Sequence, residues 1–160
     1  MPAMTATPAH AIDASAAERA VRRILMATLL LGVAGITTDL LLLNHIEDRT
    51  QLIPFAALGL TLLSLLAHAA LRSAATVRLV QVLTLVLLSC GALGVYLHFQ
   101  GNAAFQRELA PEISGGDLFW KSMRAKAPPA LAPLAFVQLA LVGWAWSFRH
   151  PLLRAANQRH

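Results

Sequence analysis

Four histidines stand at or just beyond the C-terminal ends of long apolar runs in this chain. They are His45, His68, His98 and His150. If consecutive runs cross a membrane in alternating directions, His45 and His98 lie at one surface, and His68 and His150 lie at the other. Two imidazoles at one depth of a helical bundle can ligate a b-type haem, and imidazole can also take a proton from a quinol. The pairs His45/His98 and His68/His150 therefore indicate a redox membrane subunit that uses haem b or a quinone.

Carboxylates next to His45 add further possible ligands to the first histidine pair. Glu47 and Asp48 follow His45 closely in the chain. Imidazole and carboxylate groups together suit zinc or copper, and they can also accept protons from a quinol. We therefore interpret His45, Glu47, Asp48 and His98 as candidate ligands for a metal or a small molecule, with the identity of the metal left open. The lone cysteine, Cys90, excludes an intrachain disulfide and a cysteine-based metal motif.

A few polar side chains interrupt the apolar runs and are candidates for function inside the membrane. They are Asp39, His68, Gln81 and Gln138. A carboxylate near the centre of a membrane helix costs about 2.5–3.5 kcal/mol, so Asp39 indicates either a small proton-coupled carrier or a structural hydrogen bond to Gln81, Gln138 or a threonine. At about 100° per residue, polar and small residues share one face of each of the first two runs. We expect these two faces to turn toward other helices; they comprise Thr28, Gly32, Gly35 and Asp39, and Ala57, Thr61, Ser64 and His68.

The composition identifies the elements that must position these residues. Of the 160 residues, 57% are hydrophobic and 13% are charged, and the mean hydropathy is +0.59. One soluble core does not need so much apolar surface, which argues against a soluble enzyme. A helix of roughly 20 apolar residues spans a hydrocarbon core. We predict an all-α fold, an integral membrane four-helix bundle running up-down-up-down, with spans at 24–46, 52–71, 79–99 and 131–148.

The basic residues indicate how this bundle is oriented. The net charge is +5, and arginines gather before the first span, between the second and third spans, and after the fourth. Short loops rich in Lys and Arg stay in the cytoplasm. We therefore predict a multi-pass protein of a bacterial inner membrane with both termini cytoplasmic, in contact with the lipid bilayer and not with nucleic acid. Residues 1–20 are predicted to form a disordered cytoplasmic tail, 21–150 the membrane domain, and 151–160 a basic cytoplasmic tail.

The longest connection between spans, the outer loop 100–130, is predicted to contain a short helix. Gly115, Gly116 and Asp117 provide a break and an N-cap, and an apolar side follows. Such an amphipathic helix would lie on the membrane surface or cover the bundle. We interpret its apolar side as a partner-binding surface that consists of Phe119, Trp120 and Met123.

These features together favour an accessory subunit over an enzyme. The sequence contains no glycine-rich phosphate loop and no H-E-x-x-H, C-x-x-C or G-x-S-x-G motif. We predict a non-catalytic interaction protein whose outer loop and bundle bind a small ligand, a membrane or periplasmic protein, or a second copy of the chain. The alternatives are the redox subunit described above and a small carrier that uses Asp39.

Overall fold

The computed structural model of this chain describes residues 8–126 and 129–158, and these residues form only helices, turns and loops. The α-helices are α1 (Pro8–Leu42), α2 (Leu52–Leu71), α3 (Ala74–Leu109), α4 (Gly115–Met123), α5 (Leu131–Ser147) and α6 (Pro151–Asn157), and a 3-10 turn, η1 (Arg49–Gln51), precedes α2. Within the described residues, α1, α2 and α3 are each long and apolar enough to cross a membrane. The pair α5 and α6, bent by 54°, adds a fourth candidate if it counts as one span. The all-helical prediction is confirmed, and three to four apolar helices are consistent with a membrane protein.

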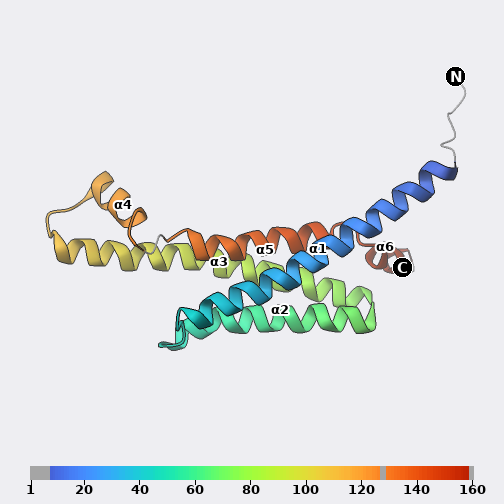
Figure 1. The fold of residues 1–160 in the computed structure, drawn as a ribbon, viewed down its shortest axis with the longest axis horizontal. Helices are drawn as coiled ribbons and strands as arrows, with labels where there is room; N and C mark the ends of the chain where they lie inside the picture. The colour runs from blue at the N-terminus through green and yellow to red at the C-terminus, as the bar shows by residue number, and fades with distance from the viewer. Residues whose placement is uncertain (1–7, 127–128, 159–160) are drawn as a thin grey trace, which may run out of the picture.

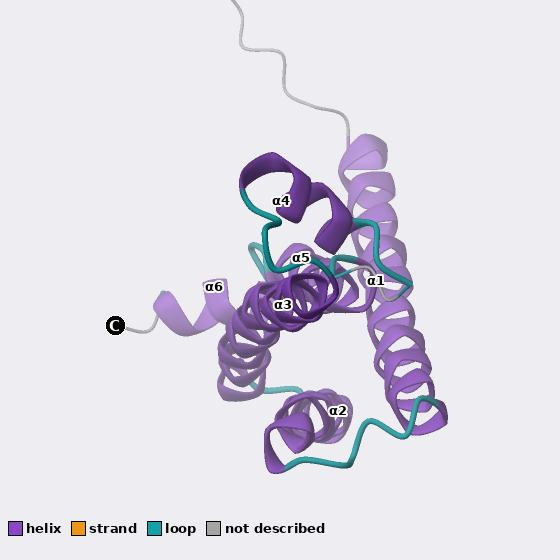
Figure 2. Ribbon diagram, turned by 90° about the vertical axis from the view of Figure 1, so that its left-hand side faces the viewer, coloured by secondary structure: helices purple, strands orange, loops and turns teal. Residues whose placement is uncertain are grey.

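The long helices lie alongside one another in alternating directions. In Figure 1, α1 and α3 run from right to left, whereas α2 and α5 run from left to right. The start of α1 and all of α6 lie at one end of the molecule, and α4 lies at the other; we call these the α6 end and the α4 end. Viewed end-on, α3 and α5 lie together near the middle, with α1 and α2 set to the sides (Figure 2). The packing agrees with this view, because α5 contacts both α3 and α1, and α3 also contacts α2.

Two helices extend beyond the spans predicted from the sequence. α1 begins at Pro8, within the tail that we predicted to be disordered, and it ends at Leu42 instead of residue 46. Alanine, the residue with the highest helix propensity, is frequent in the described part of this tail and accounts for the extension; residues 1–7 lie outside the described residues. α3 continues to Leu109, so its 36 residues measure about 54 Å and exceed a hydrocarbon core of about 30 Å.

The other boundaries agree closely with the sequence or have a local cause. α2 has the predicted bounds, and α5 ends one residue before the predicted span does. α3 begins at Ala74 because the Ser73 hydroxyl accepts a hydrogen bond from the Thr76 backbone N–H at 3.2 Å and caps the helix. The predicted basic tail contains a helix, α6, which begins at Pro151.

Glycines allow α5 to pack closely against α3. A methyl group at Gly91 would lie 2.7 Å from Val137 Cγ2 and 2.8 Å from the Pro133 carbonyl oxygen. On α5, a methyl group at Gly143 would collide with Thr84 of α3. Small residues bring membrane helices together in this way because their backbones can approach without intervening side chains. The contact between α3 and α5 therefore depends on glycine at these positions.

The two predicted polar faces have different positions in the structure. The face of α2 points inward as predicted, because Ala57, Thr61, Ser64 and His68 are all buried. On α1 the prediction holds only for Gly32, which packs against Leu139 of α5. Thr28, Gly35 and Asp39 are exposed, and the inward face carries Leu29, Val33 and Leu40. Thr28 can face outward at little cost because its hydroxyl donates to the Ile24 carbonyl oxygen of the same helix at 3.0 Å.

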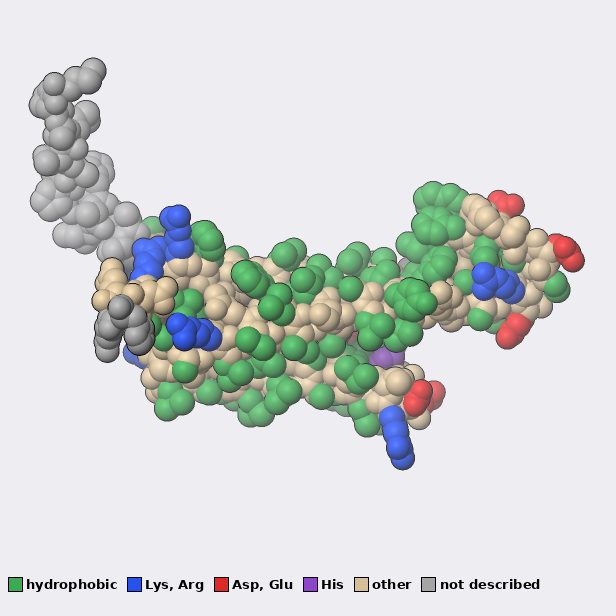
Figure 3. All heavy atoms as spheres, turned by 180° about the vertical axis from the view of Figure 1, so that it is seen from behind, with side chains coloured by type: hydrophobic (Ala, Val, Ile, Leu, Met, Phe, Trp, Pro, Cys, Tyr) green, Lys and Arg blue, Asp and Glu red, His purple; other side chains and the backbone are tan. Residues whose placement is uncertain are grey.

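Charged side chains gather at the two ends of the molecule. Figure 3 shows Lys, Arg, Asp and Glu at the ends of the face in view and hydrophobic side chains over its middle. Exposed leucines occur on all three of the longest helices, for example Leu31, Leu66 and Leu85. An apolar band between charged ends suits contact with a lipid bilayer.

Candidate functional site

A cavity of about 390 Å³ lies at the α4 end, among the end of α1, the start of α2, the middle of α3 and the start of α5. We call it the histidine cavity. Its deeper wall is apolar and includes Leu40, Cys90, Pro133 and Phe136. Its polar lining consists of His45, Thr50, Gln51 and His98. Figure 3 shows histidine atoms in a recess below the part of the molecule that carries α4.

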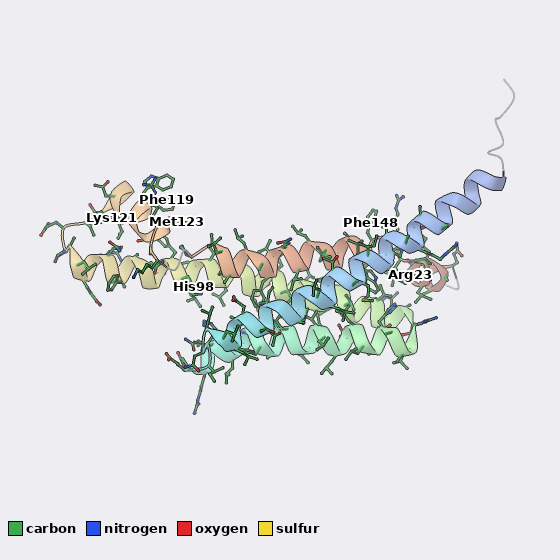
Figure 4. The ribbon with its side chains drawn as sticks, viewed as in Figure 1. Arg23, His98, Phe119, Lys121, Met123 and Phe148 are labelled. Atoms are coloured by element: carbon green, nitrogen blue, oxygen red, sulfur yellow. The ribbon has the colours of Figure 1, made fainter. Side chains whose placement is uncertain are left out.

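His45 and His98, which the sequence paired, lie next to each other in this cavity. Their ring centroids are 6.3 Å apart, and the ring planes differ by 24°. His98 lies on α3 where that helix passes the ends of α1 and α2 (Figure 4). His45 is brought opposite by the turn after α1, in which Asn44 adopts a left-handed conformation and the His45 N–H donates to the Leu40 carbonyl oxygen at 3.0 Å.

Glu47 and Asp48, the carboxylates predicted to join this pair, do not line the cavity. Both are exposed, and their backbone N–H groups donate to the Gln51 side-chain oxygen at 2.8 and 3.3 Å. Cys90 lies eight residues before His98 on α3, which places it about 12 Å along the helix axis. Within the described residues, no group of three or more His, Cys, Asp or Glu side chains could hold a metal ion. The cavity therefore presents two imidazoles without the carboxylates that we proposed as further ligands.

The second histidine pair forms a packed cluster at the α6 end. The ring centroid of His68 lies 5.4 Å from that of His150 and 4.9 Å from that of Trp146, and both contacts are edge-to-face. His68 Nδ1 lies 2.9 Å from the Thr76 hydroxyl. That hydroxyl donates to the Ser73 carbonyl oxygen at 2.8 Å, so Nδ1 of His68 acts as the donor. We call His68, Trp146, His150 and Arg22 the capping cluster.

Arg22 joins this cluster by binding the C-terminal end of α5. Its guanidinium donates to the carbonyl oxygens of Trp146, of Phe148 at 3.1 Å and of Arg149 at 3.3 Å. It also pairs with Glu18 at 2.7 Å. A cation here satisfies carbonyl groups that have no partner within the helix. This role could not be predicted from the sequence, in which Arg22 is one of several positive charges that indicate the orientation.

His150 is held in its neutral form. Burial first, and then the nearby Arg22 and His68, lower the pKa of His150 to about 4, so the ring is uncharged at pH 7. Its Nδ1 accepts a hydrogen bond from the Leu152 N–H at 3.3 Å and caps α6, where Pro151 occupies the first turn. Both histidines of this pair are therefore engaged within the protein.

The structure does not fit haem b at either histidine pair. A haem macrocycle needs open space between the helices, which glycines on the first and third spans could provide. Gly91 and Gly94 instead pack against Pro133 and Val137, and Gly32 packs against Leu139. At the α6 end, Trp146 fills the space beside His68 and His150.

The remaining candidates within the membrane are not brought together. Asp39 is exposed and lies in the last turn of α1, about 4.5 Å along the axis from the helix end, and not near the centre of a span. Gln138 is exposed and Gln81 is half-buried. His68 lies apart from Asp39, at the opposite end of the molecule, because α1 and α2 run in opposite directions (Figure 1).

The loop after α3 contains α4, which folds back against α3. The face of α4 that is buried carries Leu118 and Ser122, and the Asn102 side chain donates to the Ser122 carbonyl oxygen at 3.1 Å. Of the predicted partner-binding residues, Phe119 and Trp120 are exposed and Met123 is half-buried. Phe119 also lies 5.8 Å from Phe99 of α3, ring centroid to ring centroid. Figure 4 shows Phe119, Lys121 and Met123 on this helix.

Compared with known proteins, the chain matches no protein-family model, no curated protein and no solved structure.

Proposed function

We propose that this chain is a four-span membrane protein, an up-down-up-down bundle with α4 as an amphipathic helix outside the bilayer. The α6 end carries Arg19, Arg22, Arg23, Arg72, Arg78, Arg149 and Arg154, whereas the α4 end mixes both signs of charge. The positive-inside rule supports a cytoplasmic position for the α6 end and both termini, and we propose the inner membrane of a bacterial cell as the location of the protein. The histidine cavity would open near the outer surface.

Its function, we propose, is to bind a small ligand in the histidine cavity as a non-catalytic subunit. The cavity itself is the observation that carries this proposal. A volume of about 390 Å³, an apolar wall and a few polar groups on one side are typical of a small-molecule site. The exposed aromatic side chains of α4 support a second role, docking of a membrane or periplasmic protein partner or of a second copy of the chain.

The two alternatives have unequal support. A redox role through quinol binding is supported by the approach of His45 to His98. A carrier that uses Asp39 has less support, because Asp39 is exposed in the last turn of α1 and does not line the cavity.

Native mass spectrometry of the full-length protein, extracted from its own membrane into nanodiscs, tests ligand binding. Leu93 lines the cavity and Leu85 does not, although both are exposed leucines of α3. We expect a bound small molecule on the wild type and on Leu85→Trp, and its loss from Leu93→Trp, which fills the cavity. Wild-type protein without a bound molecule, or equal occupancy in the two variants, would contradict the proposal.

A further inference from the structure

The lining of the histidine cavity restricts the class of ligand, if the proposed binding function holds. Among the described residues that line the cavity, none is an aspartate, glutamate, lysine or arginine. A phosphate or carboxylate head needs a cationic partner when it leaves water, and an ammonium head needs an anionic or aromatic one. The phenyl ring of the lining, Phe136, lies at the apolar end of the cavity and not beside its polar groups. The ligand should therefore carry an uncharged head.

The polar and apolar parts of the lining are separated along the bundle axis. His45, Thr50 and Gln51 lie in the connection between α1 and α2 or at its end, and His98 lies level with them on α3. Cys90 and Phe136 lie further toward the middle of the bundle. A ligand that satisfies both parts has a polar head at the membrane surface and an apolar body directed into the membrane.

The cavity also borders the lipid. Among its lining residues, Leu97 is 52% exposed and Ile53 is 50% exposed, and both lie on helices that could span a membrane. A molecule dissolved in the bilayer could enter past these side chains without crossing water.

From these observations we propose that the histidine cavity binds the ring of a lipid-soluble quinone or quinol, with His45 and His98 as hydrogen-bond partners of its oxygen atoms. A neutral imidazole has one donor and one acceptor nitrogen. It can therefore donate to a quinone carbonyl or accept from a quinol hydroxyl, so the pair suits both redox forms. Pro54, Pro133 and Phe136 line the cavity with apolar ring side chains, which suit contact with a planar ring.

Cys90 offers a direct test because it is the only cysteine of the chain and lines the cavity. The rate of its alkylation by N-ethylmaleimide would be measured on the full-length protein in nanodiscs. The added compounds would be decylubiquinone, whose fully substituted ring does not alkylate thiols, decylbenzene with the same tail and no oxygen atoms, and decanoate with an anionic head. One hydrogen bond corresponds to about a tenfold difference in affinity, so decylubiquinone should protect Cys90 at about tenfold lower concentration than the other two.

Two sets of variants serve as controls. In Cys90→Ser combined with Leu85→Cys, the cysteine lies outside the cavity and should react equally with and without decylubiquinone. In the double variant His45→Leu and His98→Leu, the preference for decylubiquinone over decylbenzene should disappear, and His45→Gln with His98→Gln should restore part of it.

The outcomes separate this inference from the proposed function. Equal protection by decylubiquinone and decylbenzene, or stronger protection by decanoate, would overturn the quinone inference and leave a small-ligand site in place. No protection by any compound, together with no bound molecule in the native mass spectrum, would overturn both. If the double variants do not fold, the comparison of the three compounds on the wild type still decides the result.

Discussion

The two histidine pairs of this protein lie at opposite ends of the same bundle and have different surroundings. His68 and His150 are each only 8% exposed, contact Trp146, and make hydrogen bonds to Thr76 and Leu152. His45 and His98 lie beside a cavity, and His98 is exposed. The two pairs occupy similar positions relative to the apolar runs. His68 and His150 make hydrogen bonds within the protein, whereas His45 and His98 line a cavity that can receive a ligand. We therefore expect substitutions in the capping cluster to change stability and substitutions at the histidine cavity to change binding.

The largest difference should come from the tryptophans of α5. Trp146 is 2% exposed and packs against both histidines of the capping cluster, whereas Trp144 is 43% exposed. Trp146→Ala should lower the free energy of unfolding by about 3 kcal/mol, at the low end for a buried aromatic because lipid replaces water around the unfolded helices. Trp144→Ala should cost far less. Unfolding in mixed micelles of dodecyl maltoside and SDS would measure both, and equal losses would contradict the assignment of Trp146 to the core.

The next effect concerns Arg22 and its neighbour. Arg22→Met removes the hydrogen bonds to the end of α5, and Arg23→Met removes the same charge from an exposed position. We expect a loss of about 2 kcal/mol in the first variant and little change in the second, because charged hydrogen bonds contribute about 1.5–3 kcal/mol. Since both variants lose one positive charge near the membrane, an effect on orientation alone would make them behave alike.

Replacing one histidine of each pair by leucine should have a smaller effect on the free energy of unfolding. His68→Leu removes the hydrogen bond to Thr76 and should cost about 1–2 kcal/mol. His98→Leu should change the free energy of unfolding by less than about 0.5 kcal/mol, as for other exposed substitutions. The same micelle titration compares them. A larger loss for His98→Leu would show that the cavity histidines also hold the fold together.

The two pairs should also differ in how pH affects stability. The pKa of His150 is about 4 in the folded protein and near 6.5 when unfolded, so the unfolded chain binds the extra proton between these values. Stability should therefore fall as the pH drops from 7 to 4. His150→Asn keeps an N-cap for α6 and does not titrate, so its free energy of unfolding should fall less than that of the wild type as the pH drops from 7 to 4. An unchanged pH dependence would contradict the neutral state assigned to His150.

Much of the fold could be predicted from the sequence because a long apolar run indicates where a helix lies. The bounds of α2 agree with the prediction, and the helical character of the other runs was confirmed. Alternating directions placed His45 and His98 at the same surface, and the structure brings their rings together. The inward face of α1 could not be predicted, since Thr28 bonds to its own helix and can face lipid as readily as protein. The exclusion of Glu47 and Asp48 from the cavity depended on Gln51, which binds their backbone groups within the loop.

The sequence by itself determined that the four long apolar segments are helical, and in which order the histidines follow them. Only the tertiary structure decided which histidine pair is enclosed and which lines a cavity. The physical reason is that these helices carry apolar side chains on most of their surface. If lipid surrounds them, the hydrophobic effect does not choose which apolar face turns inward, and close contacts such as Gly91 against Pro133 select the arrangement. That contact joins α3 to α5, and Pro133 and Phe136 of α5 then form a wall of the cavity beside His98.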